Sequence, residues 1–285
     1  MRTGAKAESG NSQFASESIM TDQSFHDNWQ QGQNYENYVG RWSRLIAREF
    51  LFWLKAVPGL HWLDVGCGTG ALTQTILNEF DPLRVQGIDS AEGFIRHARE
   101  TIDDPRTAFD VGDAQELPYE DQSFDMTVSA LALNFVPNVH QALAQMQRVL
   151  KPGGTAAAYL WDYAGEMQFM RRFWDAAVEL DPHAVDLDEG ARFPICQREP
   201  LEELWRDTGL HSVEVRPIDI PTVFQDFEDF WSPFTQGQGP APGYLMSLGS
   251  DRQDQLKEAV REKLAFQADG SIQLIARAWA VKGAR

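Results

Sequence analysis

Three glycines at alternate positions are the first feature of the sequence that could do chemistry. Gly66, Gly68 and Gly70 follow an apolar run that carries Asp64 near its end. Glycine allows positive φ and lets a ligand touch the main chain, and free N–H groups of a following helix would point to the same place. Such a turn after a strand suits a nucleoside-type ligand. The spacing is G-x-G-x-G rather than the G-x-G-x-x-G of dinucleotide sites, which disfavours dinucleotide binding.

Further acidic residues follow at the ends of later apolar runs. Asp89 lies close to the ~20-residue offset at which a carboxylate can accept both hydroxyls of a ribose. Asp113 stands between Gly112 and Ala114, just after a third strand-like run. A single Asp is more often a cap or turn residue, so the indication comes from the order of the three carboxylates along the chain.

The elements that must position these residues alternate between strand and helix. Alternation of this kind predicts an α/β fold with a parallel sheet and helices on both faces. The expected strands are 60–65, 83–88, 107–111, 124–130 and 155–161; the expected helices are 71–80, 91–101 with Ser90 as N-cap, and 139–150. After residue 161 we expect helices over 167–180, 200–208, 227–234 and 251–266, strands over 211–216 and 272–281, and a loop over 236–243.

Five short motifs give the chain a resemblance to a known family. They are Leu-Asp-Val-Gly-Cys-Gly-Thr-Gly at 63–70, Gly-Ile-Asp at 87–89, Gly-Asp-Ala at 112–114, Ser-Phe-Asp at 123–125 and Leu-Lys-Pro-Gly-Gly at 150–154. In order and spacing, over roughly residues 35–159, they resemble class I S-adenosylmethionine (SAM) dependent methyltransferases of the ubiquinone/menaquinone-biosynthesis or type 11 kind. The resemblance implies a Rossmann-like seven-stranded, mostly parallel sheet with an antiparallel final hairpin.

The resemblance also implies how the cofactor is held. Asp64 would attract the ammonium group of SAM, Asp89 would accept the ribose diol beside Phe94, and Asp113 with the Ala114 N–H would bind the adenine. Segment 34–57 would form lid helices over the cofactor, although its aromatic residues could equally just cover the sheet. The residues expected to bind SAM are Tyr38, Arg41, Asp64, Gly66, Gly68, Gly70, Asp89, Ser90, Phe94, Gly112, Asp113, Ala114 and Leu131.

The expected reaction is transfer of the methyl group of SAM to a small-molecule acceptor by in-line displacement, with release of S-adenosylhomocysteine (SAH). Positioning in a dry pocket can supply ~7–11 kcal/mol of such a barrier, and no metal is required. The catalytic candidates are Asp162 and Tyr163 past the fifth strand and Asn134 past the fourth, with His140 and His183 as weaker candidates for a base. Because no base is obvious, an O, N or S acceptor is slightly favoured over carbon.

Composition sets limits on partners and location. The chain has 285 residues, with 25 basic against 42 acidic side chains and a net charge of −17. A surface of this charge repels a phosphate backbone and argues against nucleic acid as the acceptor. No apolar run approaches the ~18 residues of a membrane span, and the start lacks the apolar region of a secretory signal. A cytoplasmic monomer or homodimer is therefore expected.

Domain organisation and the alternative functions complete the expectations. Residues 1–24 are polar and predict a disordered tail, and 25–285 predict one domain in which 162–270 contribute to the acceptor pocket. Cys67 and Cys196 are too few for a disulfide framework or a zinc site. Three alternatives stay open: C-methylation of a quinol-type ring, a non-catalytic SAM-binding regulator, and a nicotinamide-dependent dehydrogenase.

Overall fold

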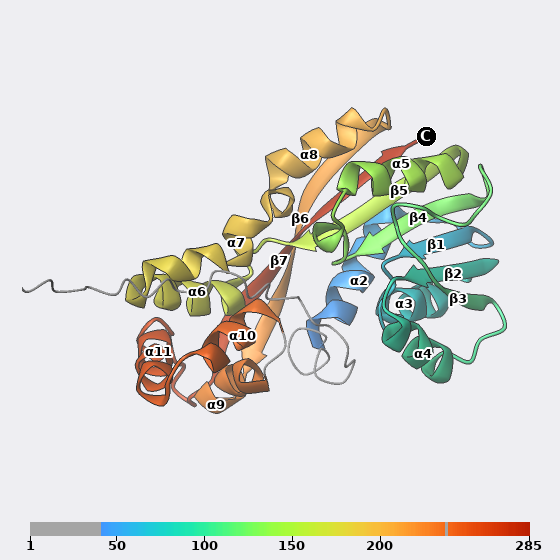
Figure 1. The fold of residues 1–285 in the computed structure, drawn as a ribbon. Helices are drawn as coiled ribbons and strands as arrows, with labels where there is room; N and C mark the ends of the chain where they lie inside the picture. Colours follow the sequence, from blue (N-terminus) through green and yellow to red (C-terminus); the bar gives the residue numbers. More distant parts are fainter. Residues whose placement is uncertain (1–40, 237–238) are drawn as a thin grey trace, which may run out of the picture.

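The computed structural model describes residues 41–236 and 239–285 (Figure 1). The predicted tail and the start of the predicted lid segment, residues 34–40 including Tyr38, lie outside these residues. Arg41 begins helix α2 (Arg41–Leu54), but its side chain is also outside the described part. The expectations for Tyr38 and for the Arg41 side chain therefore stay predictions.

A seven-stranded sheet in the order β3-β2-β1-β4-β5-β7-β6 forms the centre of the molecule. The strands β1 to β5 pair in parallel, and β7 pairs antiparallel with both β5 and β6. The predicted fold class is confirmed. The strands are β1 (His61–Val65), β2 (Arg84–Asp89), β3 (Thr107–Val111), β4 (Phe124–Ala130), β5 (Leu150–Trp161), β6 (His211–Phe224) and β7 (Ile272–Ala284).

Helices cover both faces of the sheet. Successive side chains of a strand point to opposite faces, and in the parallel strands both sets of side chains are largely apolar. In β1, Trp62 packs into one core cluster with α2, while the next residue, Leu63, packs into a second cluster with α5. The first face carries α2, α3 (Ala71–Glu79) and α4 (Glu92–Thr101); the second carries α5 (Val139–Val149) and α8 (Arg198–Asp207). The carboxyl ends of the parallel strands are thus held at one edge of a packed three-layer core.

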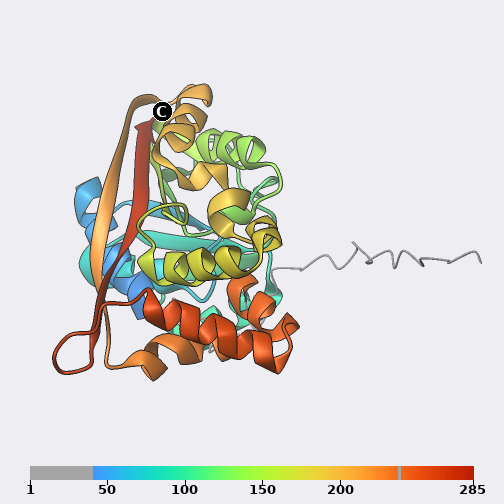
Figure 2. The ribbon, with the colours of Figure 1, turned by 90° about the vertical axis from the view of Figure 1, so that its left-hand side faces the viewer.

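The hairpin of β6 and β7 is longer than predicted and runs along one side of the molecule (Figure 2). We expected β6 to stop at residue 216, but it continues through Pro217 and Pro221 to Phe224. Proline removes a strand donor, which a central strand tolerates poorly. β6 is the edge strand of the sheet, so the missing donors cost little there.

Of the helices between β5 and β7, α6, α9, α10 and α11 lie together at the end of the β6–β7 pair that is distant from α8 (Figure 1). The expected loop over 236–243 is wrong in its second half, because α10 begins at Pro240, and proline is well tolerated in the first turn of a helix. The helices are α6 (Gln168–Leu180), α7 (Glu189–Arg192), α9 (Phe227–Trp231), α10 (Pro240–Ser247) and α11 (Ser250–Glu262), with 3₁₀ turns at Pro182–Asp186, Pro194–Cys196 and Ser232–Gln236. Within the described residues, no helix is long and apolar enough to cross a bilayer.

Candidate functional site

The glycine turn connects β1 to α3 and is tied to the end of β2. The φ angles of Gly66, Gly68 and Gly70 are +71°, +54° and +89°, values that side chains other than glycine rarely adopt. The N–H groups of Gly66 and Cys67 donate to the Ile88 carbonyl at 2.8 and 3.1 Å. These bonds fix the turn at the carboxyl edge of the sheet.

The three glycines differ in the space that surrounds them. A Cβ on Gly66 would lie 2.4 Å from the Cβ of Ala132, and one on Gly70 would lie 2.4 Å from Cδ1 of Ile102. Among the residues that the structure describes, none would lie within 4 Å of a Cβ on Gly68. Gly66 and Gly70 are therefore required by packing, whereas Gly68 leaves its main chain open to an approaching ligand.

Asp64 lies fully buried at the carboxyl end of β1. Its Oδ2 accepts a hydrogen bond from the Thr73 hydroxyl at 2.7 Å, but its Oδ1 has no hydrogen-bond partner among the described residues. Burial raises the pKa of this carboxyl to about 7, and the nearby Asp89 acts in the same direction. A buried carboxyl oxygen without a partner is costly, and a cationic group of a ligand would satisfy it.

Asp89 ends β2 and uses its carboxylate to hold two loops together. Its Oδ2 accepts the Gly68 N–H at 2.9 Å, and its Oδ1 accepts the Ala91 N–H at 2.8 Å. Burial raises its pKa. A carboxylate has about four lone-pair positions, so ribose hydroxyls could still donate to it.

Ser90 does not cap α4, which corrects the sequence prediction. The N-cap is Ala91, which makes no side-chain capping bond, and Ser90 is exposed. Asp89 takes over the usual role of a cap side chain, because its Oδ1 accepts the Ala91 N–H ahead of the first turn. Phe94, in the first turn of α4, is partly buried.

The Gly-Asp-Ala motif follows β3 and lies beside the end of β2. The Gly112 N–H donates to the Asp89 carbonyl at 3.0 Å, so the structure brings this motif next to Asp89. Asp113 is exposed, and its carboxylate accepts the main-chain N–H of Gln115 at 2.8 Å and the side-chain amide of the same residue. Adenine binding by Asp113 and Ala114 stays a prediction.

The segment after β4 lies against the glycine turn, through the contact of Ala132 with Gly66. Leu131 has a φ of +57°, a strained value for a leucine of the kind that clusters at functional sites. Asn134 lies in the 3₁₀ turn Leu133–Phe135, is 9% exposed, and its Nδ2 has no hydrogen-bond partner in the part of the chain that the structure describes. Leu131 and Asn134 thus belong to the segment that contacts the glycine turn through Ala132, and their predicted roles stay predictions.

Asp162 and Tyr163 follow β5. Asp162 is buried, its Oδ2 accepts the Glu166 N–H at 3.0 Å, and its carbonyl accepts the Met167 N–H at 2.9 Å. Its carboxylate therefore fixes the turn into α6, and its predicted part in catalysis stays a prediction. His140 and His183 are both exposed.

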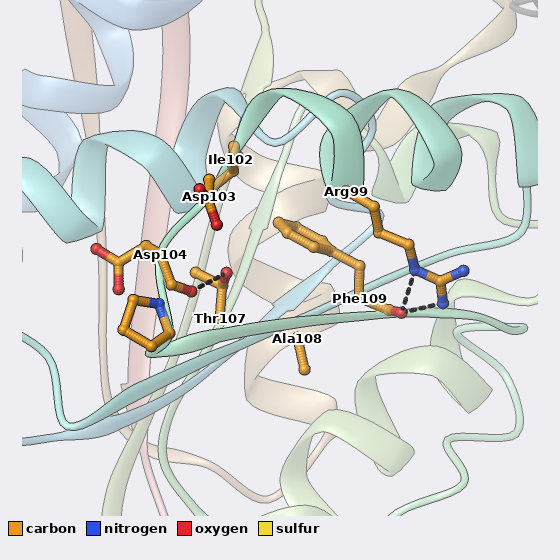
Figure 3. Close-up of a pocket in the computed structure, with 8 residues that line it drawn as sticks. Arg99, Ile102, Asp103, Asp104, Thr107, Ala108 and Phe109 are labelled. Atoms are coloured by element: carbon orange, nitrogen blue, oxygen red, sulfur yellow. Dashed lines mark hydrogen bonds between the residues drawn. The ribbon is translucent and has the colours of Figure 1, made fainter.

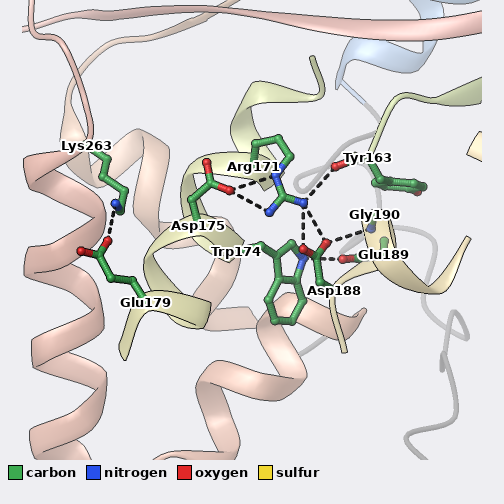
Figure 4. Close-up of polar contacts among 9 residues, drawn as sticks. All are labelled: Tyr163, Arg171, Trp174, Asp175, Glu179, Asp188, Glu189, Gly190 and Lys263. Atoms are coloured by element: carbon green, nitrogen blue, oxygen red, sulfur yellow. Dashed lines mark hydrogen bonds and ion pairs between the residues drawn. The ribbon is translucent and has the colours of Figure 1, made fainter. Parts of the chain in front are cut away.

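A pair of acidic residues that the sequence did not single out is buried beside this turn (Figure 4). The Asp188 carboxylate pairs with Arg171 at 2.8 Å, and the neighbouring Glu189 carboxyl accepts the indole N–H of Trp174. Burial raises the pKa of Glu189 to about 8. Two adjacent acids in a polar segment look like solvent-facing residues, so nothing in the pattern could have indicated their burial.

A hollow of about 450 Å³ lies elsewhere, between α4 and β3 (Figure 3). It is lined by residues such as Arg99, Ile102 and Thr107 at the carboxyl end of α4 and the amino end of β3. Asp89 and Gly112 lie at the opposite, carboxyl ends of their strands. This hollow is therefore separate from the candidate site.

Comparisons with known proteins agree with the fold and the turn. Residues 63–158 match the sequence model of a family described as a methyltransferase domain. The chain is 36% identical over 133 residues to the biotin biosynthesis bifunctional protein BioHC of Teredinibacter turnerae, a match that covers 43% of this chain but only 23% of that protein. It is 29% identical over 204 residues to demethylmenaquinone methyltransferase of Staphylococcus aureus, covering 65% of this chain and 85% of the relative.

Solved structures share the fold at low sequence identity. A putative methyltransferase from an antibiotic biosynthesis pathway of Anabaena variabilis superposes with a TM-score of 0.61 at 16% identity, over 87% of this chain and 99% of that one. Phosphoethanolamine N-methyltransferase 2 of Haemonchus contortus, in complex with SAM, gives a TM-score of 0.57 at 18% identity. The match covers 94% of this chain and 61% of that one. Together with the match to the methyltransferase-domain model, the fold and the glycine turn indicate a SAM-dependent methyltransferase, with SAM as its cofactor. The matched segment and these relatives are consistent with class I enzymes of type 11.

Proposed function

We propose that this enzyme transfers the methyl group of SAM to a small-molecule acceptor and releases SAH. The observation that carries the proposal is the unpartnered Oδ1 of Asp64, buried beside the open main chain of Gly68. An ammonium group there would pair with the carboxylate and lower its pKa, because a cation favours the charged form. SAM, when bound, supplies an electrophilic methyl group on a sulfonium.

The remaining cofactor roles are assigned to groups that can still form hydrogen bonds or contacts with the ligand. Asp89 would take the ribose hydroxyls on its free lone pairs while its bonds to Gly68 and Ala91 keep it oriented. The main chain at Gly68 would lie against the ligand, since no side chain stands in the way. Asp113 and Ala114 would bind the adenine, and Phe94 would flank it.

The acceptor would lie on the far side of the glycine turn, beside Asn134 and Tyr163. The Glu189 carboxyl near that end is not suited to remove a proton, because with a pKa of about 8 it is largely protonated at neutral pH. Asp162 also accepts a hydrogen bond that holds the turn into α6. An acceptor atom that carries its own lone pair or ionises easily is therefore favoured, which points to O, N or S. Such a reaction needs positioning more than acid–base assistance.

A second candidate is C-methylation of a quinol-type ring. It is supported by the similarity to a protein named demethylmenaquinone methyltransferase. The net charge of −17 supports a small acceptor over a nucleic acid in either case.

Turnover of SAM to SAH should be measured with thiol, amine, phenol, carboxylate and quinol acceptors, and binding of SAM, SAH and NAD by calorimetry. We expect SAM and SAH to bind and NAD not to bind, with turnover on heteroatom acceptors. Turnover of quinols alone would establish the second candidate instead. Binding of SAM without turnover of any acceptor would make the protein a non-catalytic SAM-binding regulator.

A further inference from the structure

Three aromatic rings from three separate segments meet beyond the carboxyl ends of β4 and β5. Phe135 ends the 3₁₀ turn after β4, Tyr163 follows β5, and Phe193 follows α7. The centroids of Phe135 and Phe193 are 5.3 Å apart with nearly perpendicular planes, at 79°, and those of Tyr163 and Phe193 are 6.3 Å apart. All three residues are partly exposed, unlike the fully buried aromatic residues of α6. We call these three residues the aromatic wall.

The aromatic wall lies one short segment away from the glycine turn. Gly66 contacts Ala132, and only Leu133 and Asn134 separate Ala132 from Phe135 in the chain. The Asn134 amide is nine-tenths buried and has an Nδ2 that no described residue accepts from. The segment that connects the cofactor turn with Phe135 therefore carries a buried hydrogen-bond donor.

The position of Phe193 is set by a cluster of buried polar contacts. Phe193 is the C-cap of α7, a helix of four residues that is too short to be stable by itself. The Asp188 carboxylate at the start of this helix accepts from the guanidinium of Arg171 at 2.8 and 2.9 Å, and Glu189 accepts from the Trp174 indole (Figure 4). Both donors belong to α6, so α7 is anchored to a long, well-packed helix.

A close approach of main chains fixes the other side of α7. A Cβ on Gly190 would lie 2.9 Å from Cα of Ala164 and 3.0 Å from the carbonyl oxygen of Tyr163. The guanidinium of Arg192 lies 5.0 Å from the centroid of Phe193 and stacks on its ring. α7 is thus pressed against the turn that carries Tyr163, and the rings of Tyr163 and Phe193 are held in a fixed relation.

We propose that Phe135, Tyr163 and Phe193 form the specificity-determining wall of the acceptor site, which takes a flat apolar ring bearing one oxygen as hydrogen-bond acceptor for Asn134. This inference rests on the proposed function, since it assigns the acceptor to the same site. Aromatic side chains in edge-to-face arrangement favour another flat ring over a saturated one of equal size. Asp188 and Glu189 are positioning residues, because they act by holding Phe193.

The test uses the full chain saturated with SAH and two probes, 2-naphthol and its saturated counterpart decahydro-2-naphthol. Both carry one oxygen on a fused two-ring skeleton, but only the first is flat. Two favourable ring contacts predict that 2-naphthol binds about tenfold more tightly than the saturated alcohol. Calorimetry measures both dissociation constants.

Variants assign the effect to the wall. Phe193→Ala should weaken 2-naphthol binding about tenfold and leave the dissociation constant of SAH unchanged. Phe52→Ala removes a phenylalanine that is 48% exposed on α2 and serves as the matched control, with no expected change in either constant. Glu189→Gln keeps an acceptor for the Trp174 indole and should leave 2-naphthol binding intact, whereas Glu189→Leu should weaken it.

Equal affinity for the two probes, or no binding of 2-naphthol to protein that still binds SAH, would overturn the inference and leave the proposed function standing. Unchanged 2-naphthol binding in a folded Phe193→Ala variant would also overturn it. Failure of the protein to bind SAH would overturn the proposed function itself.

Discussion

The buried carboxyl of Asp64 makes cofactor binding depend on pH in a way that can be calculated. With a pKa of about 7 in the free protein, Asp64 is about nine-tenths ionised at pH 8 and about one-tenth ionised at pH 6. An ammonium group binds the ionised form, so the dissociation constant of SAH should be about tenfold higher at pH 6 than at pH 8. Near pH 7, binding should also drive about half a proton from the protein into the buffer.

Calorimetry of SAH binding at pH 6, 7 and 8, in two buffers of different ionisation enthalpy, measures both the affinity and the proton release. Asp64→Asn can keep the hydrogen bond from Thr73 and removes the titration. Loss of one charge-assisted bond predicts an affinity about 10- to 100-fold weaker, without the pH dependence.

Asp219→Asn is the matched control, because this carboxylate lies on the edge strand β6, several strands away from β1, and binds Arg277 of β7. It should leave both the affinity and its slope with pH unchanged. A wild-type dissociation constant that is flat from pH 6 to 8 would refute the reasoning. So would an Asp64→Asn variant that retains the wild-type slope.

Three further predictions concern the turn and the buried acid pair. Gly68→Ala places a Cβ at a φ of +54° where no described residue lies within 4 Å, so the free energy of unfolding should fall by only about 1 kcal/mol. Calorimetry should nevertheless show a clear loss of SAH affinity, because the methyl group stands where the ligand would approach. Unchanged affinity would count against the proposed approach of the ligand. Gly70→Ala adds a clash with Ile102 to a φ of +89°, so the free energy of unfolding measured with denaturant should fall by about 2–4 kcal/mol. A fall smaller than that of Gly68→Ala would contradict the packing argument. Glu189 has a folded pKa of about 8 against an ordinary 4.5, so its contribution to stability is full below the ordinary value and is lost as pH rises toward 8. Thermal unfolding of Glu189→Gln should therefore depend less on pH between 5 and 8 than that of the wild type, and equal slopes would refute the assignment.

The parallel half of the sheet could be predicted from the sequence because its strands are short apolar runs separated by helical patterns. The placement of Asp64, Asp89 and the glycines at the carboxyl edge of the sheet could be predicted for a related reason, since each lies at the end of such a run. The hairpin could not be predicted in full, because Pro217 and Pro221 weaken the strand pattern and only the edge position of β6 makes them acceptable. The helix α10 was missed for a similar reason, because its first four residues are Pro-Ala-Pro-Gly.

The sequence indicated Tyr163 and Asn134 as candidates near the acceptor, but the grouping of three aromatic rings could not be predicted, because they are far apart in the chain. Phe135, Tyr163 and Phe193 come together only through the packing of α7 on α6 and on the turn after β5. The burial of Glu189 depends on Trp174, fifteen positions earlier, and no local pattern encodes that contact. The residues that we propose to select the acceptor could therefore be grouped only from the structure.

A crystal structure of the protein with SAH tests the central claim most directly. We predict that the amino group of SAH lies within about 3 Å of Oδ1 of Asp64. The ribose hydroxyls of SAH should donate hydrogen bonds to the carboxylate of Asp89, and its amino-acid chain should lie against the main chain of Gly68. A glycine turn left empty at saturating SAH, or SAH bound with its amino end away from Asp64, would contradict the account.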